Sequence, residues 1–134
     1  MDTHKIAVAR ACLEDSEQGT KGFPQIVDEL MEAGFESYMI DFRRAAATYY
    51  LPSGESVELP VRRVSKPVMA TFDAVAIQAA IRDAQQQEAD YTYAGFCERV
   101  ASAGCAGYMV SFSGRRALYF GRTAETLVEP FPGT

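Results

Sequence analysis

The sequence predicts an α+β domain in which helices pack on one face of an antiparallel sheet. Two observations predict this class. Helical periodicity gives way to strand-like alternation twice along the chain, and the two occurrences match at a constant offset of 70 residues. Helices with one apolar stripe followed by strands with one apolar face bury both surfaces when the helices cover the sheet.

The repeat aligns residues 23–60 with residues 93–130 without a gap, and nine of the 38 aligned pairs are identical. Identical pairs include Gly34/Gly104, Tyr38/Tyr108, Met39/Met109 and Tyr49/Tyr119. A unit with an apolar face that it cannot cover alone is stabilised by a second copy. The sequence therefore predicts an internal duplication: one domain over residues 1–134, built of repeats at about 4–60 and 72–130.

Each repeat is expected to begin with a helix. Apolar residues recur at helical spacing within residues 3–15 and again within residues 71–87. In the second of these segments Thr71 is the expected N-cap. Asp73 is expected in the first turn, where a negative charge suits the helix dipole.

A second helix follows in each repeat and is expected to end at a glycine, Gly34 or Gly104. Glycine adopts the left-handed backbone that commonly ends a helix without a Cβ clash. Pro24 lies near the start of the first of these helices, where a missing N–H group is tolerated. Thr92 is the expected N-cap of the other helix.

Strands are expected after each glycine. Side chains alternate over residues 38–42 and 108–112, second strands follow over 46–51 and 117–121, and third strands over 56–60 and 125–130 end at prolines. Ser113-Gly114 predicts a turn in the second repeat. The "RRAA" stretch gives a poor turn signal in the first. Residues 61–70 are either an extra strand or an extended crossover, and Pro67 argues against a central strand.

Bulk properties narrow the classes of function. The net charge of −5 disfavours a general nucleic-acid binder, whose affinity depends on Lys and Arg meeting phosphates. The three cysteines and the lack of a secretory signal favour reduced thiols in the cytoplasm. The apolar runs are shorter than the ~18 residues that a membrane span needs. We therefore expect neither nucleic acid nor a membrane as a partner.

Several stretches resemble a known family. "GFPQIVDELMEAGFESY", "DYTYAGFCERVASAGCAGYMVSF" and "YFGRTAETLVEP" resemble small bacterial and prophage-borne proteins of the YbcV/YdfO type, often labelled "phage envelope protein". This family has no assigned chemistry. The resemblance therefore implies a fold and a bacterial or prophage context, with no catalytic residues, metal or cofactor. Its members tend to carry an acidic residue at the position of Thr92 and a Trp at that of Tyr108.

The most distinctive polar feature is a set of arginine pairs. If the repeats are related by a two-fold axis, the pairs that follow the first strand of each repeat are related too. Guanidinium groups that lie close together bind carboxylate or phosphate, which makes these residues a candidate anion site. The alternative is that they are solvent-facing turn residues paired with local acids. The candidate residues are Arg43, Arg44, Arg62, Arg63, Arg115 and Arg116.

Cys97 is the candidate reactive thiol, because it lies about one turn into its helix, where the dipole lowers a thiol pKa. The repeat aligns Cys97 with Val27, which favours packing instead. His4 is expected to be solvated. Metal ligands at recognised spacing are missing from the sequence, so no metal site is expected.

Two functions remain after these considerations. The first is a non-enzymatic interaction module that binds another copy of the chain or another bacterial or phage protein. The second is a binder of a small anionic ligand, or an enzyme, that uses a crevice between the two repeats lined by the arginine pairs.

Overall fold

The computed structural model describes residues 1–86 and 90–133, and it contains four helices and six strands in this part of the chain. The predicted end of one helix at Gln87 lies outside the described residues. The first half contains α1 (Thr3–Gln18), α2 (Phe23–Glu32), β1 (Ser37–Asp41), β2 (Ala46–Tyr50) and β3 (Ser56–Pro60). The second half contains α3 (Ala74–Gln86), α4 (Tyr93–Ser102), β4 (Cys105–Ser111), β5 (Arg116–Gly121) and β6 (Thr126–Pro130).

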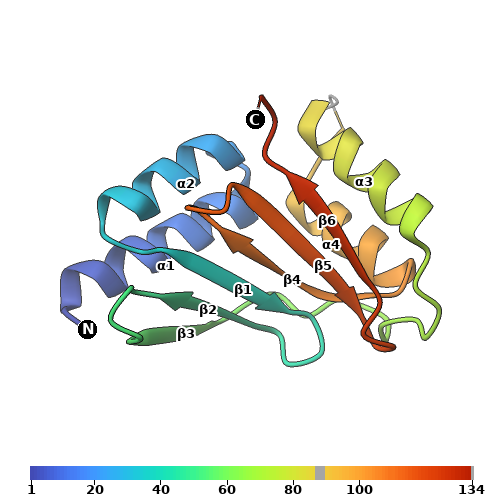
Figure 1. Ribbon diagram of the computed structural model, residues 1–134, viewed down its shortest axis with the longest axis horizontal. Helices are drawn as coiled ribbons and strands as arrows, with labels where there is room; N and C mark the ends of the chain where they lie inside the picture. The colour runs from blue at the N-terminus through green and yellow to red at the C-terminus, as the bar shows by residue number, and fades with distance from the viewer. Residues whose placement is uncertain (87–89, 134) are drawn as a thin grey trace.

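The strands form one antiparallel sheet in the order β3-β2-β1-β4-β5-β6 (Figure 1). The two halves meet at its centre, where β1 pairs with β4. Met39 lies opposite Met109 in that pair, with Ser37 opposite Ser111 and Asp41 opposite Gly107. The first strand of each half is therefore an inner strand, and each third strand is an edge.

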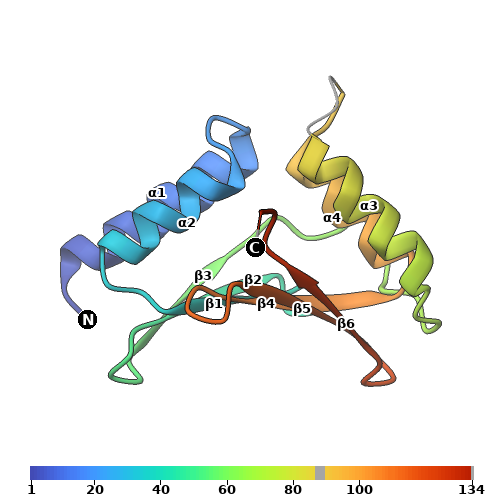
Figure 2. The same cartoon turned by 45° about the horizontal axis from the view of Figure 1, so that its top comes forward.

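All four helices lie on one face of the sheet (Figure 2). The α1/α2 pair covers the half that contains β1, β2 and β3, and the α3/α4 pair covers the other half. The core lies between these layers and includes the fully buried Leu30, Ile77 and Val100. This arrangement confirms the α+β class and the helices on one face of an antiparallel sheet.

The two halves have the same order of elements and the same strand registers at an offset of 70. Tyr38 pairs with Tyr49 as Tyr108 pairs with Tyr119. Ala46 pairs with Pro60 as Arg116 pairs with Pro130. One departure is a bulge in β4 between Cys105 and Gly107.

The helix caps agree with the sequence at one predicted position and differ at another. The Thr92 side chain accepts a hydrogen bond of 3.0 Å from the Gly95 N–H and caps α4, as predicted. Thr71 was wrong as the cap of α3. The helix begins at Ala74, and the Asp73 carboxylate accepts from the Ala76 N–H at 3.1 Å. The chain is held in this position because the Asp73 N–H donates to the Ala103 carbonyl at 2.8 Å.

The β1–β2 hairpin and the β4–β5 hairpin each close with a non-glycine residue in the left-handed region. These residues are Ala45 at φ 53° and Arg115 at φ 50°. A polar side chain at the end of the preceding strand stabilises each turn. The Asp41 carboxylate accepts from the N–H groups of Arg43 and Arg44, and the Ser111 hydroxyl accepts from the Gly114 N–H. The turn predicted at Ser113-Gly114 is confirmed, although its left-handed position falls one residue later, at Arg115.

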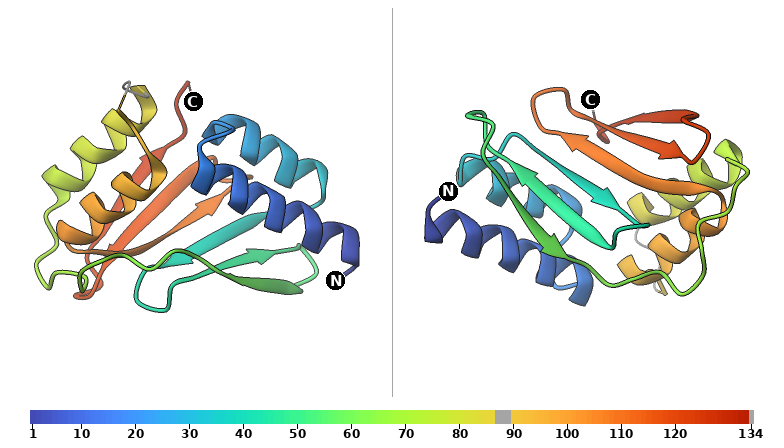
Figure 3. Two further views of the ribbon diagram at one scale, coloured as in Figure 1. Left: turned by 180° about the vertical axis from the view of Figure 1, so that it is seen from behind. Right: turned by 90° about the horizontal axis from the view of Figure 1, so that it is seen from below.

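Residues 61–73 form an extended crossover from β3 to α3 that runs past the strand ends (Figure 3). The structure assigns no strand to residues 61–70, so the second of the two alternatives for this segment is correct. Val64 and Val68 are buried and fix its path. The Glu98 carboxylate of α4 accepts hydrogen bonds from Arg62 and from Ser65, which ties the crossover to the second half.

Candidate functional site

The two helix pairs lean away from each other above the sheet (Figure 2). Residues of both pairs line a cleft between them. Its volume is about 720 Å³, within the range of small-molecule sites. One wall comes from α1 and α2 and the other from α3 and α4, while the sheet forms the floor. Representative wall residues are Leu13, Ile26, Ile81 and Phe96.

The floor is a row of four aromatic rings, which we call the tyrosine row: Tyr49, Tyr38, Tyr108 and Tyr119. These residues come from β2, β1, β4 and β5, which are consecutive in the sheet. Side chains alternate along a strand, and the registers place all four on the helix-facing side. The centroids of neighbouring rings lie 5.5, 6.4 and 5.1 Å apart along the row.

Phenol hydroxyl groups gather on this floor. The Tyr93 hydroxyl from α4 shares a hydrogen bond of 2.6 Å with the Tyr108 hydroxyl. Burial raises the pKa of Tyr38, Tyr93 and Tyr108 well above the usual value, so these groups remain neutral at physiological pH. The floor therefore offers neutral O–H groups that donate or accept hydrogen bonds inside a largely apolar cleft.

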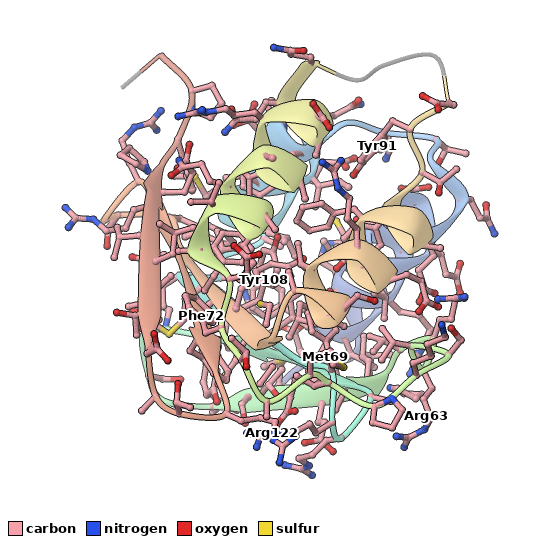
Figure 4. All side chains as sticks on the ribbon, turned by 90° about the vertical axis from the view of Figure 1, so that its right-hand side faces the viewer. Arg63, Met69, Phe72, Tyr91, Tyr108 and Arg122 are labelled. Carbon is pink, nitrogen blue, oxygen red and sulfur yellow. The ribbon has the colours of Figure 1, made fainter. Side chains whose placement is uncertain are left out.

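Six of the seven tyrosines of the chain line the cleft, since Tyr91 and Tyr93 join the tyrosine row. Figure 4 shows Tyr108 deep between α3 and α4 and Tyr91 nearer the start of α4. Phe23 at the start of α2 meets Phe131 of the C-terminal segment edge to face, with ring centroids 5.3 Å apart. This contact joins the first half of the chain to the C-terminal segment at one border of the cleft.

The charged residues that line the described part of the cleft are Glu17, Lys21 and Glu129. The Lys21 ammonium contacts two carboxylates, Glu29 at 2.7 Å and Asp15 at 3.1 Å. These hydrogen bonds, with that to Glu29 the larger cause, raise the pKa of Lys21. The local positive charge is therefore balanced by its own neighbours.

The arginine pairs do not converge on one place. In the antiparallel β1–β4 pair, Ser111 lies opposite Ser37, so the two first hairpins leave the sheet at opposite ends. The ends of these strands are about 13 Å apart, from four residues at 3.3 Å each. Arg43 and Arg44 therefore lie far from Arg115 and Arg116. The antiparallel β1–β4 register, with Met39 opposite Met109, thus separates the two arginine pairs.

In the part of the chain that the structure describes, none of the six arginines is among the residues that line the large cleft. Three of the four arginines outside the β4–β5 turn have local partners for their guanidinium groups. Arg44 pairs with Glu58 at 3.1 Å and Arg62 with Glu98 at 2.8 Å, while Arg63 donates to the Arg43 carbonyl. Figure 4 places Arg63 at the lower edge of the molecule, away from Tyr91 and Tyr108.

Arg115 and Arg116 lie at the turn between β4 and β5. The Arg115 guanidinium lies 5.4 Å from the centroid of the Phe131 ring. Arg116 donates from Nε to the Gly114 carbonyl at 3.1 Å. A role for the arginines as an anion site stays a prediction, as does the alternative of solvent-facing turn residues paired with local acids.

Cys97 is buried in α4, and burial is the largest cause that raises the pKa of its thiol to about 12. The reactive thiolate is therefore scarce at neutral pH, which supports packing over reactivity. Cys12 and Cys105 are buried free thiols as well. His4 is exposed on α1.

Sequence reasoning did not include the tyrosines among the candidate site residues and missed that four of them form one floor. The signal was present in part, because Tyr38, Tyr49, Tyr108 and Tyr119 all follow the alternation of a single face. The cleft itself depends on β1 lying beside β4 and on the separation of the helix pairs. Those are long-range features that local periodicity does not contain.

Fold and site together define an α+β protein with a tyrosine-floored cleft between two helix pairs. Residues 11–129 match the family described as "Protein of unknown function (DUF1398)", and the chain belongs to that family. A comparison with curated proteins finds no match. Within residues 1–86 and 90–133, no helix is long and apolar enough to cross a membrane, and no group of three or more metal-ligating side chains is placed to hold a metal ion.

Proposed function

We propose that this protein binds a small molecule in the cleft between its two helix pairs. The observation that carries the proposal is the cleft of about 720 Å³, floored by four tyrosine rings and walled by apolar helix residues. Sites for small molecules combine apolar walls with a few polar groups that fix orientation. The hydroxyl pair of Tyr93 and Tyr108 is such a group.

This proposal keeps the crevice of the sequence-based alternative and replaces its lining. Aromatic and aliphatic side chains line the cleft, while the arginine pairs lie at the hairpins and on the crossover. The arrangement favours an apolar or aromatic ligand body over a small inorganic anion. Binding without catalysis is the simpler role, because the floor hydroxyls stay protonated and Cys97 stays a thiol.

The test uses the uncharged dye N-phenyl-1-naphthylamine, whose fluorescence rises in apolar sites. We expect saturable binding to the wild-type protein. Ala84 lines the cleft from α3, so Ala84→Phe is expected to fill part of the space and weaken binding at least fivefold. Ala11 lies exposed on α1, and Ala11→Phe is the matched control with unchanged binding.

Circular dichroism of both variants shows whether they fold. Absence of saturable binding to the wild-type protein would contradict the proposal. Equal affinity of folded Ala84→Phe and wild-type protein would contradict it as well, because the dye would then bind elsewhere.

A second proposal, a non-enzymatic interaction module, is supported by the face of the sheet that the helices leave uncovered. Met109 and Val128 point to this side and are 42% and 44% exposed. We propose a second copy of the chain as the partner. Light scattering is expected to give a dimer mass that falls to a monomer mass in Met109→Glu, and a wild-type monomer at high concentration would remove this reading.

We also propose three finer relationships. The repeated registers of the two halves support the internal duplication. The match to a family of unknown function supports kinship with the YbcV/YdfO-type bacterial and prophage proteins. Three buried free thiols support a reducing, cytoplasmic location.

A further inference from the structure

Glu129 breaks the correspondence between the two halves at the sheet side of the cleft. Its partner at the offset of 70 is Leu59, which is buried in the first half. Both residues lie on third strands and face the helix layer, since Leu59 pairs with Ala47 and Glu129 pairs with Ala117. A carboxylate therefore occupies an inward position where the other half has an apolar side chain.

The Glu129 carboxylate has neutral partners among the described residues. The Gln78 side-chain amide donates to it at 2.8 Å, and that of Gln85 approaches at 3.5 Å. No Lys, Arg or His in the described part of the chain lies within ion-pair distance of it. Within the described ranges, its charge is thus held at the cleft by amide donors and not balanced by a cation.

The rest of the lining adds negative charge. Glu17 lines the wall formed by α1 and α2, and its carboxylate accepts from the backbone N–H of Arg62 at 3.1 Å. Among the described residues that line the cleft, the one cation is Lys21, and it is bound by Asp15 and Glu29. The nearby guanidiniums are also engaged, since Arg62 pairs with Glu98 and Arg115 lies against the Phe131 ring. Glu17 of α1 and Glu129 of β6 therefore line a cleft whose floor is a row of aromatic rings.

Aromatic rings carry negative charge on their faces and attract organic cations, with tyrosine among the effective residues. Six tyrosines line this cleft, and two carboxylates supply the complementary ionic partners. A large apolar body with one positive charge satisfies both features at once. An anion of the same size would meet unbalanced carboxylates and lose affinity.

We propose that the ligand of the cleft is a cationic amphiphile, an organic ammonium or similar onium group carried on an aromatic or alkyl body. This inference rests on the proposed function and specifies its ligand class. Glu129 is the principal anionic contact and Glu17 the second.

The test compares two probes of nearly the same shape and opposite charge, tetraphenylphosphonium and tetraphenylborate, by isothermal titration calorimetry. Tetraphenylphosphonium is expected to bind to the wild-type protein. In Glu129→Gln its affinity is expected to fall about fivefold, while the affinity for tetraphenylborate rises or stays constant. Affinity for uncharged N-phenyl-1-naphthylamine is expected to remain within twofold.

Two further variants control for charge and for folding. Glu125 lies exposed in the turn between β5 and β6, and Glu125→Gln removes the same charge without affecting binding. If Glu129→Gln unfolds because α3 loses the Gln78 contact, Glu17→Gln on the exposed side of α1 replaces it and is expected to weaken cation binding about threefold.

The outcomes separate this inference from the proposed function. If the uncharged dye binds and tetraphenylborate binds as tightly as tetraphenylphosphonium or more tightly, the preference for a cation is overturned. The cleft then remains a small-molecule site. Unchanged phosphonium affinity in the folded carboxylate variants overturns it too. If none of the three probes binds, the proposed function itself fails.

Discussion

Two glycines at matching positions have different surroundings, and their difference can be measured. Gly34 and Gly104 both follow a helix and have φ of 102° and 96°. A Cβ on Gly104 would lie 1.9 Å from the Thr71 carbonyl oxygen, which belongs to the backbone. At Gly34 the nearest atom is the flexible end of Lys5, at 3.1 Å. Steric overlap therefore excludes a side chain at Gly104, whereas at Gly34 the backbone angle is what disfavours one.

We expect Gly34→Ala to lower the free energy of unfolding by about 1–2 kcal/mol, the strain of an L-residue in this region. Gly104→Ala should lower it by about 3 kcal/mol or more, because the crossover at Thr71 must also move. Urea denaturation followed by circular dichroism measures both. Equal losses would show that the contact with Thr71 has no energetic weight.

The buried thiols make stability depend on alkaline pH. Burial raises the pKa of Cys12 and Cys105 to about 11 and that of Cys97 to about 12, from 9.0. A raised pKa means that the folded state retains the proton while the unfolded state loses it. The stabilisation is complete below pH 9 and is lost as the pH rises toward 12.

We therefore expect the melting temperature to fall steeply between pH 9 and pH 12. Each buried thiol lowers the free energy of unfolding by up to about 1.4 kcal/mol per pH unit in this window. Cys97→Ala removes one buried thiol and leaves a cavity. The variant should therefore be less stable at pH 7, and its melting temperature should fall less steeply as the pH rises. A melting temperature that stays constant up to pH 11 would refute the raised pKa values of the buried thiols.

At the scale of the elements, the first hairpin shows how a turn forms without glycine. Asp41 is the last residue of β1, and its carboxylate accepts from two backbone N–H groups at 3.0 and 3.2 Å. Aspartate side chains commonly mimic a backbone turn in this way. Asp41 therefore compensates for the left-handed Ala45.

We expect Asp41→Ala to lower the free energy of unfolding by about 1 kcal/mol, while Asp41→Asn retains the acceptor oxygen and costs less than half of that. Thermal denaturation of both variants is the measurement. Equal destabilisation by the two substitutions would mean that the charge, and not the turn geometry, is the important property.

Helices and strands followed well from local patterns, since the change of period after Gly34 and Gly104 marks where helix becomes strand. The cap at Asp73 was missed because Thr71 and Asp73 are both good capping residues, and a contact with Ala103 decides between them. The turn at Ala45 was missed because its acceptor, Asp41, looks in sequence like an ordinary outward strand residue. Tertiary contacts decide both cases.

At the scale of the whole molecule, the least predictable feature is the effect of pairing β1 with β4 on the positions of the site residues. The arginine pairs at the β1–β2 and β4–β5 hairpins lie apart, because antiparallel pairing of β1 with β4 sends these hairpins to opposite ends. The same pairing brings Tyr38 beside Tyr108 and creates the floor of the cleft. The pairing of β1 with β4 thus separates the arginines of the predicted anion site and brings together the tyrosines of the cleft floor.

The register of that pair predicts the behaviour of half the chain. Because β1 and β4 pair symmetrically about Met39 and Met109, a second copy of β1 can replace β4 with Met39 opposite Met39. We expect a fragment of residues 1–68 to form a folded homodimer. Without a partner its central strand would expose an unpaired edge.

Light scattering and circular dichroism over a concentration series test this. Helicity and dimer mass should rise together with concentration. A folded monomer would show that the first half covers its own apolar face, and an unfolded monomer would show that the second half supplies contacts which β1 cannot replace.

Each wall of the cleft belongs to a different half, and the floor belongs to both. A molecule held there touches both walls, so its binding energy is lost when either half opens. Occupancy should therefore make the two halves unfold as one cooperative unit. Amide protons of α2 and α3, far apart in the chain, would then exchange with solvent at a common, slowed rate.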